Sequence, residues 1–296
     1  MFSQIIVGLN DREGGRDAIA LAKNLIGKGG RLTIAHVLAR DAYAYRGAGA
    51  RYAAGELALA VAEHEEEGAV ALLETISAQA QLDELGLEVT QRCVRSRSVG
   101  RGLHELAELE RADLLVLGSS RQGLIGRVRI GDDTRAALNG APCAVAIAPA
   151  GYSERPVVLR EVGVGYDGSP ESEHALKVAR DLAREWNARL SACTAVSVPT
   201  SAFGRGELLL SDAIDPLVSD ARERIDALGG VEGHAAYGAA VEELSLYSAS
   251  LDLLIVGSRD YGPLGRLVHG STSAQLARTA RCPLLVLTRA ARAPDA

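Results

Sequence analysis

Two glycine-rich stretches in the second half of the chain combine glycines with the polar groups that a phosphorylated ligand requires. The longer one, GSRDYGPLGRLVHGSTS over residues 257–273, follows an apolar run and ends in three hydroxyl residues. Glycines let backbone N–H groups approach a ligand, and a helix N-terminus attracts anions. The chain contains no Walker A motif. The spacing therefore predicts a different kind of phosphate loop, with helix capping alone as the alternative.

The shorter stretch matches the dinucleotide pattern G-x-G-x-x-G from Gly163 to Gly168 and contains Asp167. A carboxylate inside that turn repels a pyrophosphate, and the expected second strand, 190–198, has no acidic residue at its end to hold a ribose. Two other interpretations are open. The stretch is an ordinary strand-to-helix turn that begins a helix at the Ser-Pro pair 169–170, or Asp167 accepts hydrogen bonds from a ribose or a base.

An internal repeat shows that these stretches belong to one of two similar halves. DLLVLGS at 113–119 returns as DLLIVGS at 252–258, an offset of 252 − 113 = 139, and several glycines downstream keep the same offset. The first strands, IIVGLN at 5–10 and VGVGYD at 162–167, are 157 residues apart. The first half thus carries about 18 more residues (157 − 139), which we place at 41–55. We predict domains at 1–150 and 157–290, with a linker at 150–156.

Each half reads as alternating strands and helices, the pattern of a parallel sheet. In the first half we expect strands at 5–9, 32–37, 87–94, 114–117 and 143–148, and helices at 17–26, 56–85, 102–110 and 133–138. In the second half we expect strands at 161–164, 190–198, 231–237, 253–256 and 284–287, and helices at 171–186, 211–228, 241–249 and 273–279. Ligands of such doubly wound α/β folds bind at the carboxyl ends of strands. Both glycine-rich stretches lie there.

The composition of the chain argues against several classes of protein. Hydrophobic residues make up 47% of the chain and the net charge is −6, so we expect a globular protein that does not bind nucleic acid through a basic surface. The sequence has neither a signal-peptide pattern nor an apolar run that would span a membrane. Four widely spaced cysteines without a C-x-x-C pair favour reduced thiols and a cytoplasmic location, and they do not predict a metal site.

The longer stretch resembles the G-x2-G-x9-G-[S/T] motif of universal stress proteins. Two residues separate Gly257 from Asp260, and nine more precede Gly270 and Ser271; Asp260 stands where the family usually has a glycine. Asp167 matches the acidic residue at the end of the family's first strand. The resemblance covers both halves, so it implies a tandem protein of two five-stranded, doubly wound parallel-sheet domains with the adenine nucleotide alpha hydrolase-like fold.

The resemblance implies an ATP site in the second half, with Mg²⁺ as the companion ion. In ATP-binding members the strand-one acid and a residue at the end of strand two hold adenine and ribose, while the glycine loop holds the phosphates. Carried over by position, the nucleotide-binding residues are Asp167, Ala195, Gly257, Ser258, Gly262, Gly265, Gly270, Ser271 and Ser273. A carboxylate at Asp260 costs phosphate affinity unless an arginine or a divalent metal neutralises it.

The first half departs from this pattern. Asn10 replaces the acid, Arg121 replaces a loop glycine, and acidic residues at 132–133 replace two hydroxyls. Carboxylates at a helix N-terminus repel phosphate. We therefore expect lost or altered binding here, unless arginines of the loop compensate. The corresponding candidates for a second site are Val37, Gly118 and Gly131.

These observations favour a regulatory or stress-response protein that binds an adenine nucleotide. No residue stands out as a general base or nucleophile, so any ATP hydrolysis is expected to be slow and incidental. Two alternatives are a nucleotide-free interaction module and an ATP-using transferase or ligase. The apolar last strands, 144–148 and 284–287, resemble the elements through which the family pairs its domains, which implies a homodimer or pairing of the two halves within one chain.

Overall fold

The computed structural model describes residues 1–9, 12–39, 66–78, 86–119, 126–128, 131–155, 157–197, 210–258 and 272–288, without the side chains of 12, 132, 133 and 210–213. The strands are β1 (Phe2–Leu9), β2 (Ile26–Ala39), β3 (Glu88–Ser96), β4 (Leu114–Gly118), β5 (Ala144–Ala148), β6 (Glu161–Gly165), β7 (Arg189–Val196), β8 (Glu232–Tyr237), β9 (Leu253–Gly257) and β10 (Leu284–Leu287). The helices are α1 (Arg12–Leu25), residues 66–78, α3 (Val99–Glu110), α4 (Asp132–Leu138), α5 (Pro170–Trp186), α6 (Leu210–Asp226), α7 (Ala240–Tyr247) and α8 (Thr272–Thr279).

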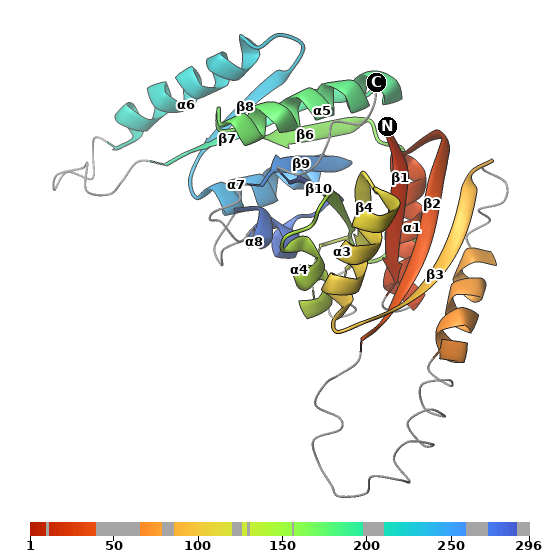
Figure 1. Ribbon diagram of the computed structural model, residues 1–296. Coiled ribbons are helices and arrows are strands. Elements are labelled where there is room, and N and C mark those ends of the chain that lie inside the picture. The colour runs from red at the N-terminus through yellow and green to blue at the C-terminus, as the bar shows by residue number, and fades with distance from the viewer. Residues whose placement is uncertain are drawn as a thin grey trace, which may run out of the picture.

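The strands of both halves join in one ten-stranded sheet of order β3-β2-β1-β4-β5-β10-β9-β6-β7-β8 (Figure 1). Within each half all neighbouring strands are parallel, as the alternation of strands and helices predicts. The halves meet where β10 pairs antiparallel with β5, Leu285 opposite Ala146. The two apolar last strands therefore pair with each other inside the chain, one of the two arrangements expected from the sequence.

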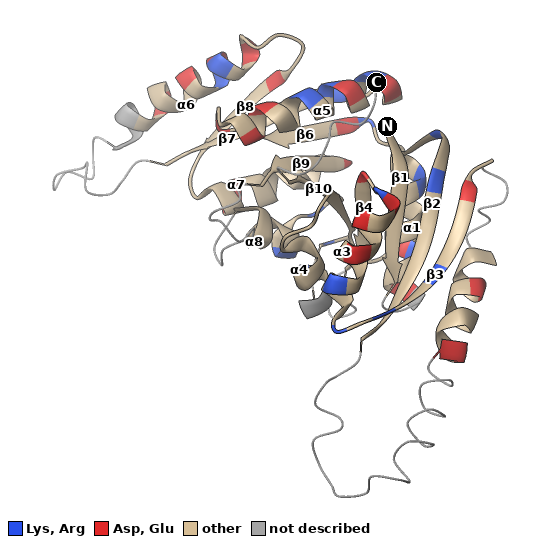
Figure 2. Cartoon of the chain, in the orientation of Figure 1, with Lys and Arg blue, Asp and Glu red and all other residues tan. Residues whose placement is uncertain are grey.

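Helices cover both faces of the sheet, and each face has its own core. On one face α1, α5, α6 and helix 66–78 contribute buried side chains; on the other, α3, α4, α7 and α8 do so. The four central strands β4, β5, β9 and β10 contain no charged residue (Figure 2), because both of their faces are covered. The charged residues lie instead on the helices and the outer strands.

The observed elements differ from the expected ones mainly around the second strand. We expected a helix to Ile26 and a strand from residue 32, whereas β2 already begins at Ile26. Ile26 pairs with Phe2 across a register irregularity, which extends the strand backwards. Of the helix expected at 56–85 the described part is 66–78, and the extra segment at 41–55 lies outside the described residues. Each of the other expected elements is present.

The repeated aspartate before β4 and β9 has a structural role. Asp113 accepts hydrogen bonds from the backbone N–H groups of Ser3 (2.7 Å) and Gln4 (3.1 Å). Asp252 does the same for Arg160 (2.8 Å) and Glu161 (2.9 Å). Each carboxylate thus satisfies backbone donors at the start of the neighbouring strand, which would otherwise pair only with water.

Replacing Asp252 by alanine is expected to lower the free energy of unfolding by about 1–2 kcal/mol, because two charge-assisted hydrogen bonds are lost at a partly exposed position. Urea denaturation of the purified chain measures this change. Asp220→Ala, at an exposed carboxylate of α6, is the control and is expected to change stability by less than about 0.5 kcal/mol. Equal effects of the two substitutions would contradict the assigned role of Asp252.

The segment between the halves is pinned to α1. The buried carboxylate of Asp17 accepts hydrogen bonds from the backbone N–H groups of Gly151 (2.8 Å) and Ser153 (2.7 Å). Asn24 donates to the hydroxyl of the buried Tyr152 at 2.9 Å. The expected linker is therefore an ordered connection fixed to the first half.

Candidate functional site

A cavity of about 330 Å³ opens in the second half at the carboxyl ends of β6, β7 and β9. Its described lining residues are Gly165, Tyr166, Asp167, Ser169, Glu171, Ser172, Cys193, Ala195, Ala240, Leu244, Val256, Gly257, Thr272 and Ser273. The volume lies at the lower end of the range of small-molecule sites. This is the position at which doubly wound sheets bind ligands.

The cavity brings together residues that lie far apart in the sequence. Asp167, Ala195, Gly257 and Ser273 all line it. The next predicted residue, Ser258, is buried, and its backbone N–H donates to the carbonyl oxygen of Leu287 at 2.9 Å. Ser258 is not among the lining residues, so it supports the start of the loop rather than the cavity wall. Four other predicted residues lie outside the described residues: Gly262, Gly265, Gly270 and Ser271.

The turn after β6 fixes Asp167 at the cavity. Asp167 Oδ1 accepts a hydrogen bond from the backbone N–H of Ser169 at 3.0 Å. Gly168 has φ 74°, a left-handed conformation that glycine adopts without strain. Ser169 then caps α5 by accepting from the backbone N–H of Ser172 at 3.3 Å, and Pro170 occupies the first turn. The turn expected from the Ser-Pro pair is thus confirmed, and it holds a carboxylate against the cavity.

Three helices begin at this cavity, and their N-termini shape its electrostatic potential. Glu171 lies in the first turn of α5, Ala240 is the first residue of α7, and Thr272 is the first of α8. The residue before α7, Ala239, makes no side-chain capping bond, whereas Ser98 caps α3 in the first half. Partial positive charges at these helix N-termini act against the negative charge of the two carboxylates of the wall.

The glycines of the two glycine-rich stretches also have packing roles. A Cβ added to Gly257 would collide with the backbone oxygen of Glu171, and one added to Gly118 would collide with that of Gly14. A Cβ at Gly163 would meet the side chains of Leu251 and Tyr247. Close approach of the neighbouring elements therefore requires glycine at these positions in either half, so Gly118, Gly163 and Gly257 are not in themselves evidence of a ligand.

The described wall offers little acid–base chemistry. Burial, with a smaller contribution from Glu243, raises the pKa of the Cys193 thiol to about 11. Burial and a hydrogen bond to Glu173 raise the pKa of Tyr166 to about 12. Both groups are protonated at neutral pH, and the described part of the wall contains no histidine, lysine or arginine. Neither of these two groups is a base or a nucleophile at neutral pH, and the remaining ionisable side chains of the described wall are the carboxylates of Asp167 and Glu171.

Within the described residues no group of three or more His, Cys, Asp or Glu side chains could hold a metal ion. No helix in the described part of the chain is long and apolar enough to cross a membrane.

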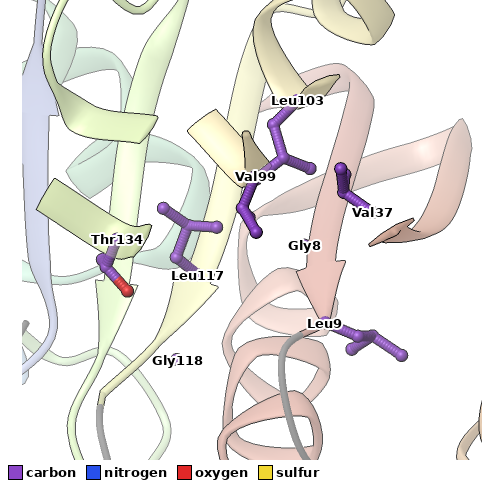
Figure 3. A pocket seen from close by; sticks show the side chains of 8 residues that line it. All are labelled: Gly8, Leu9, Val37, Val99, Leu103, Leu117, Gly118 and Thr134. Carbon is purple, nitrogen blue, oxygen red and sulfur yellow. The ribbon is translucent and has the colours of Figure 1, made fainter. Parts of the chain in front are cut away.

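The corresponding place in the first half is almost filled. Its cavity measures about 10 Å³, and side chains from several elements gather around it (Figure 3). The lining residues are Gly8, Leu9, Val37, Val99, Leu103, Leu117, Gly118 and Thr134. Each of them corresponds in the repeat to a residue that lines the cavity of the second half. The two cavities are therefore counterparts, but only one is large enough for a small molecule.

Four lining side chains of the first half are larger than their counterparts, and one, Leu9, is smaller than its counterpart Tyr166. Val37 is the counterpart of Ala195. In each half a glycine of the first strand pairs with a residue of the second strand, and Val37 and Ala195 each lie two residues after that paired residue. Val99 and Ala240 are the first residues of α3 and α7. The same comparison gives Leu117 for Val256 and Thr134 for Ser273. The first half thus has two more side-chain carbons at Val37 and at Val99, and one more at Leu117 and at Thr134. Protein interiors are packed so closely that even one additional methylene group changes the space that is left.

The candidate residues of the first half do not form an equivalent site. Val37 and Gly118 line the small cavity. Gly131 is the N-cap of α4 and makes no side-chain capping bond, and it is not among the lining residues. Asn10 lies outside the described residues.

A second hollow, of about 360 Å³, shares Val37 with the small cavity and lies at the end of β2 beside helix 66–78. Its described wall contains His36 but no carboxylate or hydroxyl side chain. Burial lowers the pKa of His36, whose Nδ1 bonds the carbonyl oxygen of Leu9 at 3.1 Å, so the ring is neutral at pH 7.

Sequence reasoning missed most of the cavity wall. The overlooked residues are Gly165, Tyr166, Ser169, Glu171, Ser172, Cys193, Ala240, Leu244, Val256 and Thr272. Several of them adjoin a predicted residue, and the expected helix at 241–249 already indicated that a helix begins near Ala240. What the sequence did not indicate is that this helix starts at the cavity.

Known proteins share both the sequence pattern and the fold. The universal stress protein family model matches residues 1–149 and 159–288. Universal stress protein Mb2346c of Mycobacterium bovis is 26% identical over 214 residues, covering 68% of this chain and 73% of that protein. Universal stress protein Mb2028c of the same species is 30% identical over 185 residues, covering 59% and 61%.

Solved structures show the same fold over nearly the full length. A universal stress protein from Archaeoglobus fulgidus superposes with a TM-score of 0.62 at 17% identity, covering 97% of this chain and 98% of that one. A Pseudomonas aeruginosa protein of unknown function, PA1789, gives 0.64 at 16% identity, covering 97% and 92%. With the family model matching both halves, this chain belongs to the universal stress protein family.

Proposed function

We propose that the second half binds one adenine nucleotide, ATP with Mg²⁺, and that the chain acts as a regulatory or stress-response protein. The observation that carries the proposal is the cavity of about 330 Å³ on which Asp167, Ala195, Gly257 and Ser273 converge. These residues come from three strand ends and the start of α8. They are also the positions that match the nucleotide-binding pattern of the family.

The residues of the wall fit the parts of the ligand. Asp167 would accept hydrogen bonds from the ribose or the base, and the backbone at Ala195 would contact adenine. Ser273, near the N-terminus of α8, would donate to phosphate together with the loop before it. The carboxylates of Asp167 and Glu171 supply oxygen donors of the kind that Mg²⁺ prefers, and the ion would reduce their repulsion of the phosphates.

In this proposal the first half binds no nucleotide and serves as an interaction module fixed to the binding half. The observation that favours this role is the cavity of about 10 Å³, which is too small for a nucleoside. An enzymatic role is not part of the proposal. The protonated thiol of Cys193 and phenol of Tyr166 do not favour transferase or ligase chemistry.

Freshly purified protein is expected to release ATP or ADP when it is denatured, and titration of nucleotide-free protein is expected to give one site per chain. Chromatography of the supernatant and isothermal titration calorimetry measure the two results. NAD in the supernatant would contradict the proposal. So would the absence of nucleotide combined with no thermal shift at millimolar ATP, and two sites per chain would contradict the role given to the first half.

A further inference from the structure

The helix α8 connects the cavity of the second half to the first half. Its first residues, Thr272 and Ser273, line the cavity, and Ser273 is buried. With eight residues the helix is about 12 Å long. Its inward side chains Leu276 and Ala277 are fully buried, as Ser273 is nearly so, which means that one side of α8 is packed against the core from its first turn to its last.

The far end of α8 is held by the first half. The carbonyl oxygen of Ala280, the residue after α8, accepts a hydrogen bond from the backbone N–H of Val128 at 2.8 Å. Val128 belongs to the first half and is fully buried, in a cluster that also contains Leu276, Ala277 and Ala280. This is a contact between the halves that lies outside the β5–β10 pair.

Val128 is anchored in its own half. The neighbouring Gly126 donates its backbone N–H to the carbonyl oxygen of Ala150 at 2.8 Å, and Ala150 donates to Arg127 at 3.3 Å. Residues 126–128 occupy the place in the first half that corresponds to part of the predicted phosphate loop in the second. A segment that the repeat predicts to face a ligand thus contacts the other half instead.

The C-terminal end of α8 is also tied to α7. Ser245 donates to the carbonyl oxygen of Thr279 at 2.8 Å, and Ser248 Oγ accepts from the backbone N–H of Arg281 at 2.9 Å. The first residue of α7, Ala240, lines the cavity as well. Two helices therefore run from the cavity to the place where Val128 of the first half is docked.

We propose that Val128 is a positioning residue for the nucleotide site of the other half: it fixes α8, and α8 places Thr272 and Ser273 at the ligand. This inference rests on the proposed function. In this inference the first half, although it binds no nucleotide itself, influences the affinity of the second half for ATP. By reciprocity, a bound nucleotide stabilises the contact between Val128 and Ala280.

Val128→Ala keeps the backbone bond to Ala280 but truncates the side chain in the buried cluster that includes Leu276 and Ala277, and it is expected to raise the Kd for ATP by about two- to thirtyfold, the usual range of couplings between distant sites. Val7→Ala is the matched control, since Val7 is equally buried in the first half but belongs to the opposite core. Calorimetric titration gives Kd and thermal unfolding gives Tm. Both variants are expected to lower Tm, and only Val128→Ala is expected to raise Kd.

A second measurement uses the unmodified chain. Saturating ATP is expected to slow amide hydrogen exchange at Val128 by at least about threefold, although this amide lies in the other half. If ATP does not bind the unmodified chain, the proposed function fails. If ATP binds but neither the exchange at Val128 nor the Kd of Val128→Ala changes relative to the control, the positioning role of Val128 is wrong while the nucleotide site stands.

Discussion

Replacing Ala195 and Ala240 together by valine is expected to weaken ATP binding at least about thirtyfold while the chain remains folded. The two alanines line the open cavity, and valines occupy the same places in the filled cavity of the first half. Forcing extra carbons into occupied space costs about 1–3 kcal/mol for each side chain. A ligand that must compete with both valines is therefore expected to bind at least about thirtyfold more weakly, as calorimetric titration with ATP would measure.

The first half provides the control for this experiment. Because Val37 and Val99 are tolerated in the same architecture, the double variant is expected to keep its circular dichroism spectrum and a cooperative thermal transition. The reverse exchange, Val37→Ala with Val99→Ala, is expected to leave the Kd of the second half unchanged. Unaltered ATP affinity in the Ala195→Val, Ala240→Val variant would place the nucleotide elsewhere.

The order of the elements was predictable because the repeat and the apolar pattern agree. The strands at 114–117 and 253–256 are uninterrupted apolar runs, as fully covered parallel strands must be, and the repeat places them in equivalent positions. The aspartate at the head of each run was visible as a repeated residue, but its role was not. That role depends on a strand more than ninety residues away in sequence, whose free N–H groups only the folded sheet brings near Asp113 and Asp252.

The difference between the two cavities was not predictable from the offset that revealed the repeat. Thr134 and Ser273 are 273 − 134 = 139 residues apart, but Val99 and Ala240 are 240 − 99 = 141 apart, and the other elements have offsets of their own. Aligning the two halves at the single offset of 139 therefore does not pair Val99 with Ala240, the first residues of α3 and α7. Each exchange is also conservative: three are apolar for apolar, and the fourth is Thr for Ser. The effect of these exchanges on the cavity volume becomes visible only in the structure, where the exchanged side chains line the same cavity.

The glycines show a second reason why the site could not be predicted fully, because a glycine in the sequence can serve either ligand binding or close packing. In the sequence, Gly257 reads as part of a phosphate loop, and Gly163 as part of a dinucleotide turn. In the structure both lie where a strand passes close to a helix, and Gly118 does the same in the half whose cavity is filled. Glycine content alone therefore does not separate a binding half from a degenerate one. The side chains that fill or leave open the space between those elements do.

Asp167→Asn is expected to raise the Kd for ATP by about ten- to a hundredfold, because hydrogen bonds to a charged group contribute about 1.5–3 kcal/mol. Asparagine keeps a carbonyl oxygen that can accept from Ser169 N–H, so the turn that begins α5 is preserved. Asp167→Ala also removes that turn bond and is expected to weaken binding further and to lower Tm. Calorimetric titration and thermal unfolding separate the ligand contact from the turn contact.

The corresponding first-half substitution, Asn10→Ala, tests which half binds. It is expected to leave the Kd for ATP unchanged, because the cavity bounded by the described residues on that side measures only about 10 Å³. Loss of binding in Asn10→Ala with normal binding in Asp167→Asn would assign the nucleotide to the first half, in spite of its filled cavity. Normal binding in both would mean that neither strand-one residue contributes measurably to the affinity, and would contradict the role given to Asp167.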